Sequence, residues 1–163
     1  MHGSAAILAI AMAGAILPSS ASAQEPAIDR ADRVAIFKAA GAVQRDGRWV
    51  ICVDDPATSG AVIEQVRDLN GDGRPEAVVV EEGSFCHGAA GTGYTLLGRQ
   101  PDASWKVIDF NSGVPEFLDT VGEGGWPDIS VGGPGFCFPV LRWNGSAYVP
   151  DRHEYEGRRC DPE

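Results

Sequence analysis

The chain has 163 residues, a formal net charge of −10 and four cysteines. Because so acidic a chain repels phosphate groups, the composition disfavours nucleic acid and anionic membrane surfaces as partners. The 21 glycines and 11 prolines are spread between apolar segments, which is typical of turns in a compact fold and excludes a long disordered linker.

The N-terminus has the layout of a secretory signal. An unbroken run of apolar and small residues, 5–17, precedes Pro18 and Ala21-Ser22-Ala23, whose small side chains suit a signal peptidase. The run is about half as long as a membrane-spanning helix requires. We therefore expect a signal peptide over residues 1–23, a mature chain without a membrane span, and a secreted or periplasmic location. A buried N-terminal helix is the alternative.

The remaining residues, 24–163, have the size of a single domain. All the cysteines lie in this part, at Cys52, Cys86, Cys137 and Cys160. An even number of cysteines in an exported chain predicts two disulfides, and the absence of a Cys-x-x-Cys pair argues against zinc. Four cysteines allow three pairings, which the spacing alone does not decide.

A single helix is predicted over Pro26–Ala40. Its apolar residues recur at helical spacing, at Ala27, Ala31, Val34 and Phe37. Pro26 suits the first turn of a helix, and Gly41 suits its end.

The rest of the chain has the composition of β-strands separated by turns. Asp46-Gly47 and Asn144-Gly145 each lie between apolar segments and predict tight hairpins. Further strands are expected at 77–81, 94–98, 105–110 and 128–131. The predicted fold class is mainly β, with one N-terminal helix.

One stretch, Asp68 to Glu76, has the pattern of a calcium-binding loop. Calcium takes six to eight oxygen ligands, and a loop that winds around it presents an oxygen at every second residue. Asp68, Asn70 and Asp72 offer side-chain oxygens, the Arg74 carbonyl offers another, and Glu76 completes the set. Gly73 occupies the sixth position, where the chain turns sharply. The alternative is a plain polar turn, but a turn alone does not require carboxylates at both ends.

Residues 68–79 resemble the calcium loop of FG-GAP and VCBS-type repeats. The twelfth position is Val79 instead of the glutamate of an EF-hand, and strand-forming residues follow the loop. The resemblance implies a structural calcium ion held by Asp68, Asn70, Asp72, Arg74 and Glu76. It also implies blade-like β repeats of a kind common in adhesion and extracellular recognition proteins.

A second, degenerate copy of the motif lies further along the chain. Gly73-Arg74-Pro75-Glu76-Ala77 aligns with Gly125-Trp126-Pro127-Asp128-Ile129. Thr120, Gly122 and Gly124 replace the first three ligands, so we expect this copy to have lost its metal. Because a propeller needs at least about four blades, two copies predict a small sheet or sandwich against which the helix packs.

The repeat also suggests how the cysteines pair. Each copy leads into a Phe-Cys pair, at residues 85–86 and 136–137. The equivalence of these positions predicts a Cys86–Cys137 disulfide, which leaves Cys52 to pair with Cys160.

Other candidate sites favour structural interpretations. His87 follows Cys86, but adjacent strand residues point to opposite faces, and a disulfide-bonded cysteine is no nucleophile. His87 and His153 match no zinc-protease pattern, and the glycine-rich segments 88–93 and 132–135 lack the features of a phosphate-binding loop. Some of the C-terminal aromatic residues could form a recognition patch, although core packing is favoured: Trp126, Phe136, Phe138, Trp143 and Tyr148.

The sequence therefore predicts an exported, non-catalytic module that calcium stabilises and that recognises a protein or a glycan. The alternative is a secreted hydrolase or enzyme inhibitor that uses surface carboxylates. Acidic pairs such as Asp54-Asp55 and Glu81-Glu82 would serve a glycosidase only if two carboxylates converged in a cleft.

Overall fold

A computed structural model of the protein describes residues 28–162. The predicted signal peptide and the first residues of the predicted helix lie outside this range. The described chain is mainly β, as predicted, with three antiparallel sheets and one long helix. The elements in chain order are α1 (Arg30–Ala39), β1 (Val43–Arg45), β2 (Arg48–Val50), β3 (Ala61–Arg67), β4 (Glu76–Glu82), α2 (Ser84–His87), β5 (Thr92–Arg99), β6 (Trp105–Ser112), β7 (Val114–Val121), β8 (Pro127–Gly132), β9 (Phe138–Trp143), β10 (Tyr148–Tyr155) and β11 (Arg158–Arg159), with short 3-10 turns at Gly88–Ala90 and Glu123–Gly125.

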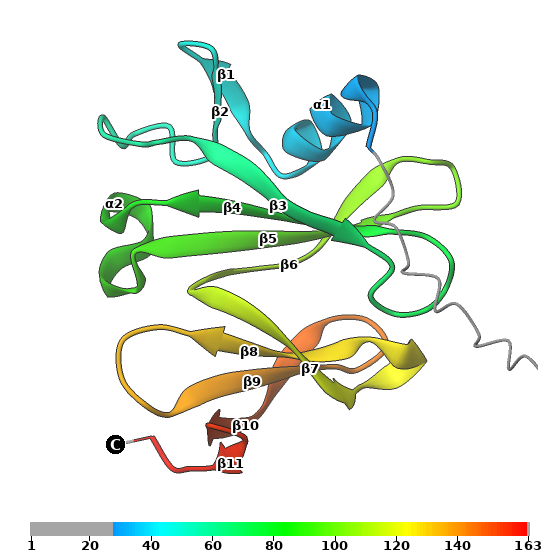
Figure 1. Ribbon diagram of the computed structural model, residues 1–163, viewed down its shortest axis with the longest axis vertical. Helices are drawn as coiled ribbons and strands as arrows, with labels where there is room; N and C mark the ends of the chain where they lie inside the picture. The colour runs from blue at the N-terminus through cyan, green and yellow to red at the C-terminus, as the bar shows by residue number, and fades with distance from the viewer. Residues whose placement is uncertain (1–27, 163) are drawn as a thin grey trace, which may run out of the picture.

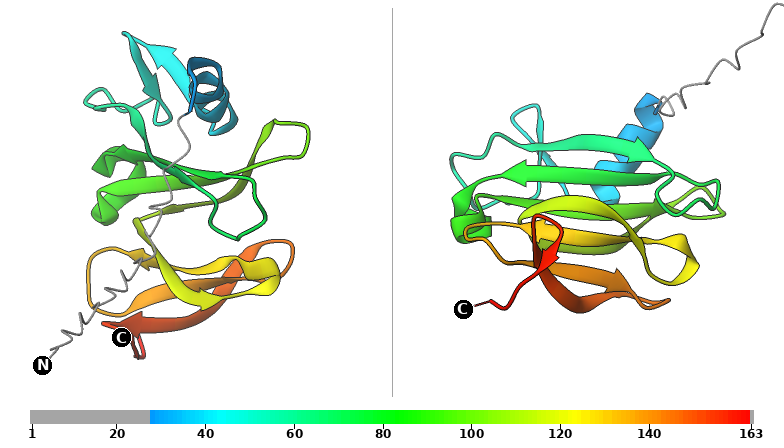
Figure 2. Two further views of the ribbon diagram at one scale, coloured as in Figure 1. Left: turned by 45° about the vertical axis from the view of Figure 1, so that its right-hand side comes forward. Right: turned by 60° about the horizontal axis from the view of Figure 1, so that its bottom comes forward.

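These elements form three layers, which Figures 1 and 2 show from different sides. The first layer holds α1 and the β1–β2 hairpin. The second is a four-stranded sheet in the order β3-β4-β5-β6, and the third is a five-stranded sheet in the order β11-β10-β9-β8-β7. Each larger sheet is thus built on a meander of four consecutive antiparallel strands, β3–β6 and β7–β10.

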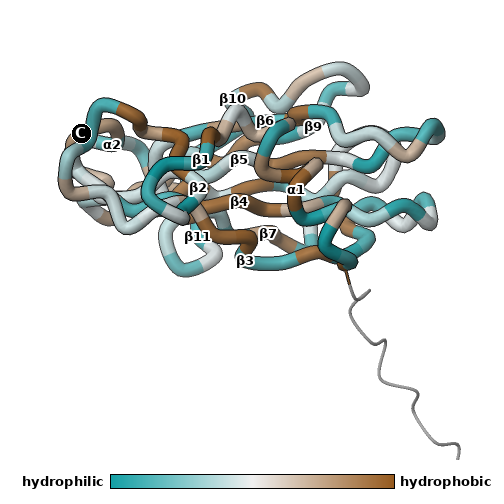
Figure 3. Tube along the Cα trace, turned by 90° about the horizontal axis from the view of Figure 1, so that it is seen from above, coloured by the Kyte–Doolittle hydropathy of each residue, from teal (hydrophilic) through white to brown (hydrophobic). Residues whose placement is uncertain are grey.

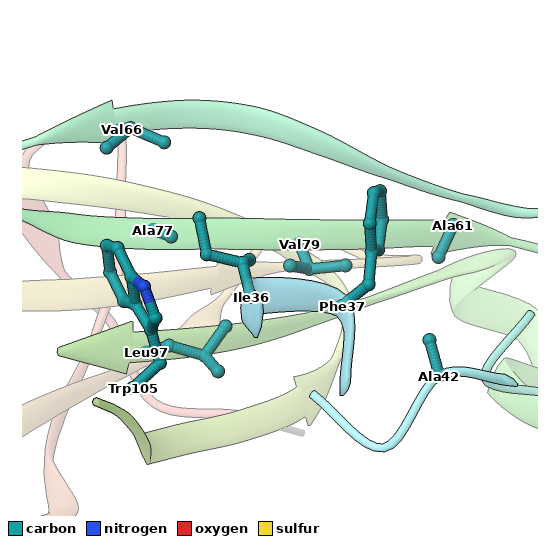
Figure 4. Close-up of a cluster of buried hydrophobic side chains, with 9 residues drawn as sticks. All are labelled: Ile36, Phe37, Ala42, Ala61, Val66, Ala77, Val79, Leu97 and Trp105. Carbon is teal, nitrogen blue, oxygen red and sulfur yellow. The ribbon is translucent and has the colours of Figure 1, made fainter. Parts of the chain in front are cut away.

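Helix α1 covers the outer face of the four-stranded sheet. Asp29 caps the helix, because its Oδ1 accepts a hydrogen bond of 2.8 Å from the Asp32 amide, and the left-handed Gly41 follows its end. Ile36 and Phe37 then lie over β4, beside Ala77 and Val79 (Figure 4). This first core cluster also includes Ala42, Ala61, Val66, Ala77, Val79, Leu97 and Trp105.

The second core lies between the two large sheets. Val78 and Leu96 face Ile129 and Leu141 across it, with Tyr94, Val131 and Tyr148 completing the cluster. Because successive strand residues alternate between faces, the continuous apolar run of β4 supplies both cores. Figure 3 shows hydrophobic segments along the middle strands and hydrophilic loops at the ends.

The two meanders stack with equivalent faces pointing in the same direction. Ala77 and Val79 face α1, and their counterparts in the aligned repeat, Ile129 and Val131, face the first meander. Helix α1 therefore covers the first meander on the face where a preceding meander would otherwise pack.

The predicted disulfide pairing is wrong. Cys52 pairs with Cys86, and Cys137 pairs with Cys160, with Cα–Cα distances of 6.1 and 5.9 Å. Equivalent positions in stacked sheets are displaced by roughly 10 Å, the spacing of packed sheets, whereas a disulfide requires Cα atoms about 4.4 to 6.8 Å apart. Each cysteine therefore bonds to a neighbouring segment of its own part of the chain.

This pairing predicts the result of peptide mapping. Proteolysis of the unreduced protein should release peptides that join Cys52 to Cys86 and Cys137 to Cys160. The bridges close loops of 34 and 23 residues, so replacing either pair by serine should lower the free energy of unfolding by about 3 to 4 kcal/mol. Urea denaturation measures this change, and a peptide joining Cys86 to Cys137 would contradict the fold.

Candidate functional site

The predicted calcium loop connects β3 to β4. The Asp68 carboxylate accepts hydrogen bonds from the amides of Gly71 and Gly73, at 2.8 and 2.9 Å. Asn70 Oδ1 accepts from the Asp72 amide at 2.9 Å, and Asp72 Oδ1 accepts from the Arg74 amide at 2.8 Å. The side chains thus fold the loop around themselves, which is the turn chemistry of Asp and Asn.

Gly71 and Gly73 make this winding possible. Both have a positive φ, of 76° and 83°, which residues with a Cβ rarely adopt. The loop also lies against the corresponding loop of the second meander, because a Cβ at Gly125 would come within 2.7 Å of the Asn70 carbonyl oxygen. The two aligned loops are therefore neighbours in space.

Glu76, the last predicted ligand, is the first residue of β4 and is only 2% exposed. Its Oε2 accepts a hydrogen bond of 2.7 Å from the Leu69 amide, at the opposite end of the loop. Burial raises the pKa of Glu76 to about 7; the Leu69 hydrogen bond opposes the rise, and the carboxylates of Asp72 and Asp68 add to it. Within residues 28–162, no lysine or arginine forms an ion pair with this carboxylate.

Asp128 occupies the equivalent position in the second meander, and its surroundings are different. Its side chain is fully buried, yet the guanidinium groups of Arg142 and Arg152 both donate to it at 2.7 Å. Thr120 Oγ1 donates a further hydrogen bond at 2.6 Å. Burial alone would raise the pKa of Asp128, but the hydrogen bonds from Arg142, Thr120 and Arg152 outweigh it and lower the pKa to about 2.

The arginines of this network are themselves held in place. Arg152 is almost fully buried and also pairs with Asp151 and Glu154. Arg142 donates to Asp128 through both Nε and Nη2, a bidentate arrangement that fixes its orientation. The internal alignment of the two motif copies identified Thr120 and Asp128. It did not identify Arg142 and Arg152, because these arginines lie on β9 and β10, outside the repeated motif.

The potential ligands of the loop are oxygens, which hard cations prefer, although its carboxylates do not form a closed ligand shell. Among residues 28–162, no three acidic, histidine or cysteine side chains are grouped closely enough to hold a metal ion. The donors are nevertheless all oxygens, and a carboxylate oxygen that accepts one hydrogen bond keeps a further lone pair. The buried Glu76 also has no positively charged partner among the described residues. These residues fit calcium by the nature of their donors.

The five aromatic residues considered as a recognition patch fall into two separate groups. Trp126, Trp143 and Tyr148 pack on one another with ring centroids 5.3 to 6.2 Å apart, and the Tyr148 hydroxyl donates to the Pro127 carbonyl. They belong to the core between the sheets. Phe136 and Phe138 instead contact Tyr155 beside the Cys137–Cys160 bridge, and Phe136 is 74% exposed.

The remaining candidates are used structurally. Cys86 is bonded to Cys52, so it is not a free thiol. The Glu81 carboxylate is buried and accepts hydrogen bonds from the Ile51 and Cys52 amides and from Thr58 Oγ1. Asp55 is also buried, and its Oδ1 accepts from the Ala57 amide.

Comparisons with known proteins leave the site to be interpreted from its geometry. No family model matches the chain, and no curated protein or solved structure is significantly similar to it. No helix within residues 28–162 is long and apolar enough to cross a membrane.

The Asp128 network should contribute strongly to stability. Replacing Asp128 by asparagine keeps the shape but removes the charge that compensates two guanidinium groups, so the free energy of unfolding should fall by about 2 to 4 kcal/mol. Urea denaturation measures the loss. Asp119→Asn, which changes an exposed aspartate of β7, is the matched control and should change stability by less than about 0.5 kcal/mol.

The same network predicts a pH dependence. The pKa of Asp128 is lower in the folded state than its ordinary value of 3.8, so its stabilising effect is complete above about pH 4 and is lost as the pH falls toward 2. The Asp128→Asn variant should therefore lose less stability than the wild type across this range. Equal losses in the two proteins would show that the arginines do not stabilise the Asp128 carboxylate.

Proposed function

We propose that the protein is an exported, non-catalytic module that calcium stabilises through the 68–76 loop and that recognises a protein or a glycan. The observation that carries the calcium component is the contrast between the two aligned carboxylates. Asp128 receives two guanidinium groups, whereas the equally buried Glu76 has a backbone amide and two further carboxylates nearby. Arg74 of the loop pairs with Asp72, so a bound cation would give Glu76 the positive partner that arginines give Asp128.

The residues that would hold calcium are those of the loop itself. Asp68, Asn70 and Asp72 offer side-chain oxygens, the Arg74 carbonyl offers a backbone oxygen, and Glu76 offers a buried carboxylate. When bound, the ion would neutralise these carboxylates and join the end of β3 to the start of β4. A structural role of this kind requires no conformational switch.

Export and recognition have separate support. Two disulfides within the described residues suit an oxidising compartment, in agreement with the signal peptide that the sequence predicts. The disulfide leaves no free thiol at Cys86, and the hydrogen bonds that Glu81 accepts from the Cys52 amide and Thr58 Oγ1 support a structural role for this carboxylate. Recognition of a partner is the role that the exposed aromatic side chains support.

Calcium should raise the melting temperature of the disulfide-bonded protein. At about 100 times the dissociation constant, binding to the folded state alone adds about 2.7 kcal/mol, which corresponds to roughly 5 to 10 °C for a domain of this size. Differential scanning calorimetry in calcium and in chelator measures the shift. Asp72→Ala should abolish it.

Asp102→Ala is the matched control. Asp102 also lies in an exposed turn, and its Oδ1 accepts from the amide two residues later, as that of Asp72 does. This variant should keep the full calcium effect. A melting temperature that calcium leaves unchanged in the wild type, or shifts equally in the Asp72 variant, would remove calcium from the proposed function.

A further inference from the structure

We propose that a pocket at the α2 end of the four-stranded sheet binds a sugar, with room for about one monosaccharide. This inference rests on the recognition part of the proposed function and gives it a site and a ligand class. The pocket has a volume of about 330 Å³ and lies between β4, β5, β6 and the Cys52–Cys86 bridge. Cavities of this size are typical of small-ligand sites.

A histidine in the wall of this pocket has one ring nitrogen without a hydrogen-bond partner among the described residues. His87 Nδ1 lies 3.2 Å from Ser112 Oγ, but His87 Nε2 is buried and has no hydrogen bond. It is the one side-chain atom in this condition within the described part of the chain. Buried polar atoms almost always have partners, so this nitrogen indicates a missing one. Because protein atoms cover this nitrogen, a ligand would contact it only after the ring turns, and a hydroxyl would then serve either tautomer, since it both donates and accepts.

The position of this histidine is built into the fold. A Cβ at Gly93 would lie only 2.1 Å from His87 Cε1, so the imidazole occupies the space that any other side chain at residue 93 would fill. The disulfide at the preceding residue, Cys86, ties α2 to the chain before β3. The ring therefore packs against β5 at Gly93, where there is no side chain, and the Cys52–Cys86 bridge fixes the position of α2.

Among the described residues that line the pocket, one carries a carboxylate, Glu81. This carboxylate accepts hydrogen bonds from the Ile51 amide of the wall at 3.2 Å and, outside the pocket lining, from the Cys52 amide at 2.6 Å and Thr58 Oγ1 at 2.9 Å. Thr95, Asn111 and Ser112 add neutral donors and acceptors to the wall. This inventory suits a neutral ligand with several hydroxyl groups.

An exposed aromatic ring completes the argument for a sugar. Phe110 of β6 lines the pocket and is 73% exposed, which is unusual for a phenylalanine. The face of an aromatic ring is negative and apolar, so it packs well on the C–H face of a pyranose. The pocket thus offers hydrogen-bonding groups on one side and an apolar ring on the other. A sugar matches both, because it carries hydroxyl groups and an apolar C–H face.

The pocket is separate from the calcium loop. Glu76 begins β4 beside the loop and Glu81 lies near its other end, five residues away, which corresponds to about 17 Å along a strand. Calcium binding and sugar binding can therefore be measured independently.

The test is titration of the disulfide-bonded protein with the methyl glycosides of glucose, galactose, mannose and N-acetylglucosamine, followed by ¹H–¹⁵N NMR. At least one glycoside should cause saturable shifts of the amides of His87, Gly93, Asn111 and Ser112. Phe110→Ala should weaken this binding about tenfold or more. Val121→Ala, which truncates an exposed apolar side chain at the end of β7 in the other sheet, should leave it unchanged.

Two results would overturn the proposal: no saturable shift with any of these glycosides, or shifts that Phe110→Ala leaves intact. Repeating the titration in calcium and in chelator separates this inference from the calcium component. If the protein binds a glycoside but calcium does not stabilise it, the sugar site is supported and the calcium component is rejected. Stabilisation by calcium without glycoside binding would do the reverse.

Discussion

The burial of β4 on both faces is the constraint on which the rest of the structure depends. Ala77, Val78 and Val79 are fully buried, and they alternate between the core under α1 and the core between the sheets. Neither layer can be removed without exposing one of these cores to water. The strand also connects the two candidate sites, because the calcium loop precedes its first residue and the pocket lies at its other end.

Each meander has a buried carboxylate at the start of an inner strand, Glu76 in β4 and Asp128 in β8, but the surroundings of the two charges differ. The cost of burying a charge is high unless it is paired. In the second meander Arg142 and Arg152 pair with Asp128 and are supported by Asp151 and Glu154. In the first meander Glu76 has no such partner among the described residues, because the nearby Arg74 of the loop pairs with Asp72 instead. The proposed calcium follows from this difference between two otherwise similar units.

Much of this fold could be predicted from local patterns, and the failures have physical causes. The helix, both hairpins and the strands at β4, β5, β6 and β8 were predicted within a few residues. Strand β3 was missed because a bulge between Ile63 and Gln65 interrupts its alternation, and β7 because it contains Pro115, which an edge strand tolerates. The disulfide pairing, the arginines at Asp128 and the division of the aromatic residues depend on contacts between distant segments, which no local pattern records.

The most direct test of the calcium account is the stability of Glu76→Gln beside that of the wild type, measured by urea denaturation in chelator and in calcium. Without calcium, the variant should be at least as stable as the wild type, because it removes a buried charge that has no positive partner within residues 28–162. With calcium, the order should reverse, because the variant has lost a ligand. A variant less stable than the wild type by the same amount in both conditions would show that the Glu76 carboxylate stabilises the fold without calcium, and would contradict the proposed calcium site.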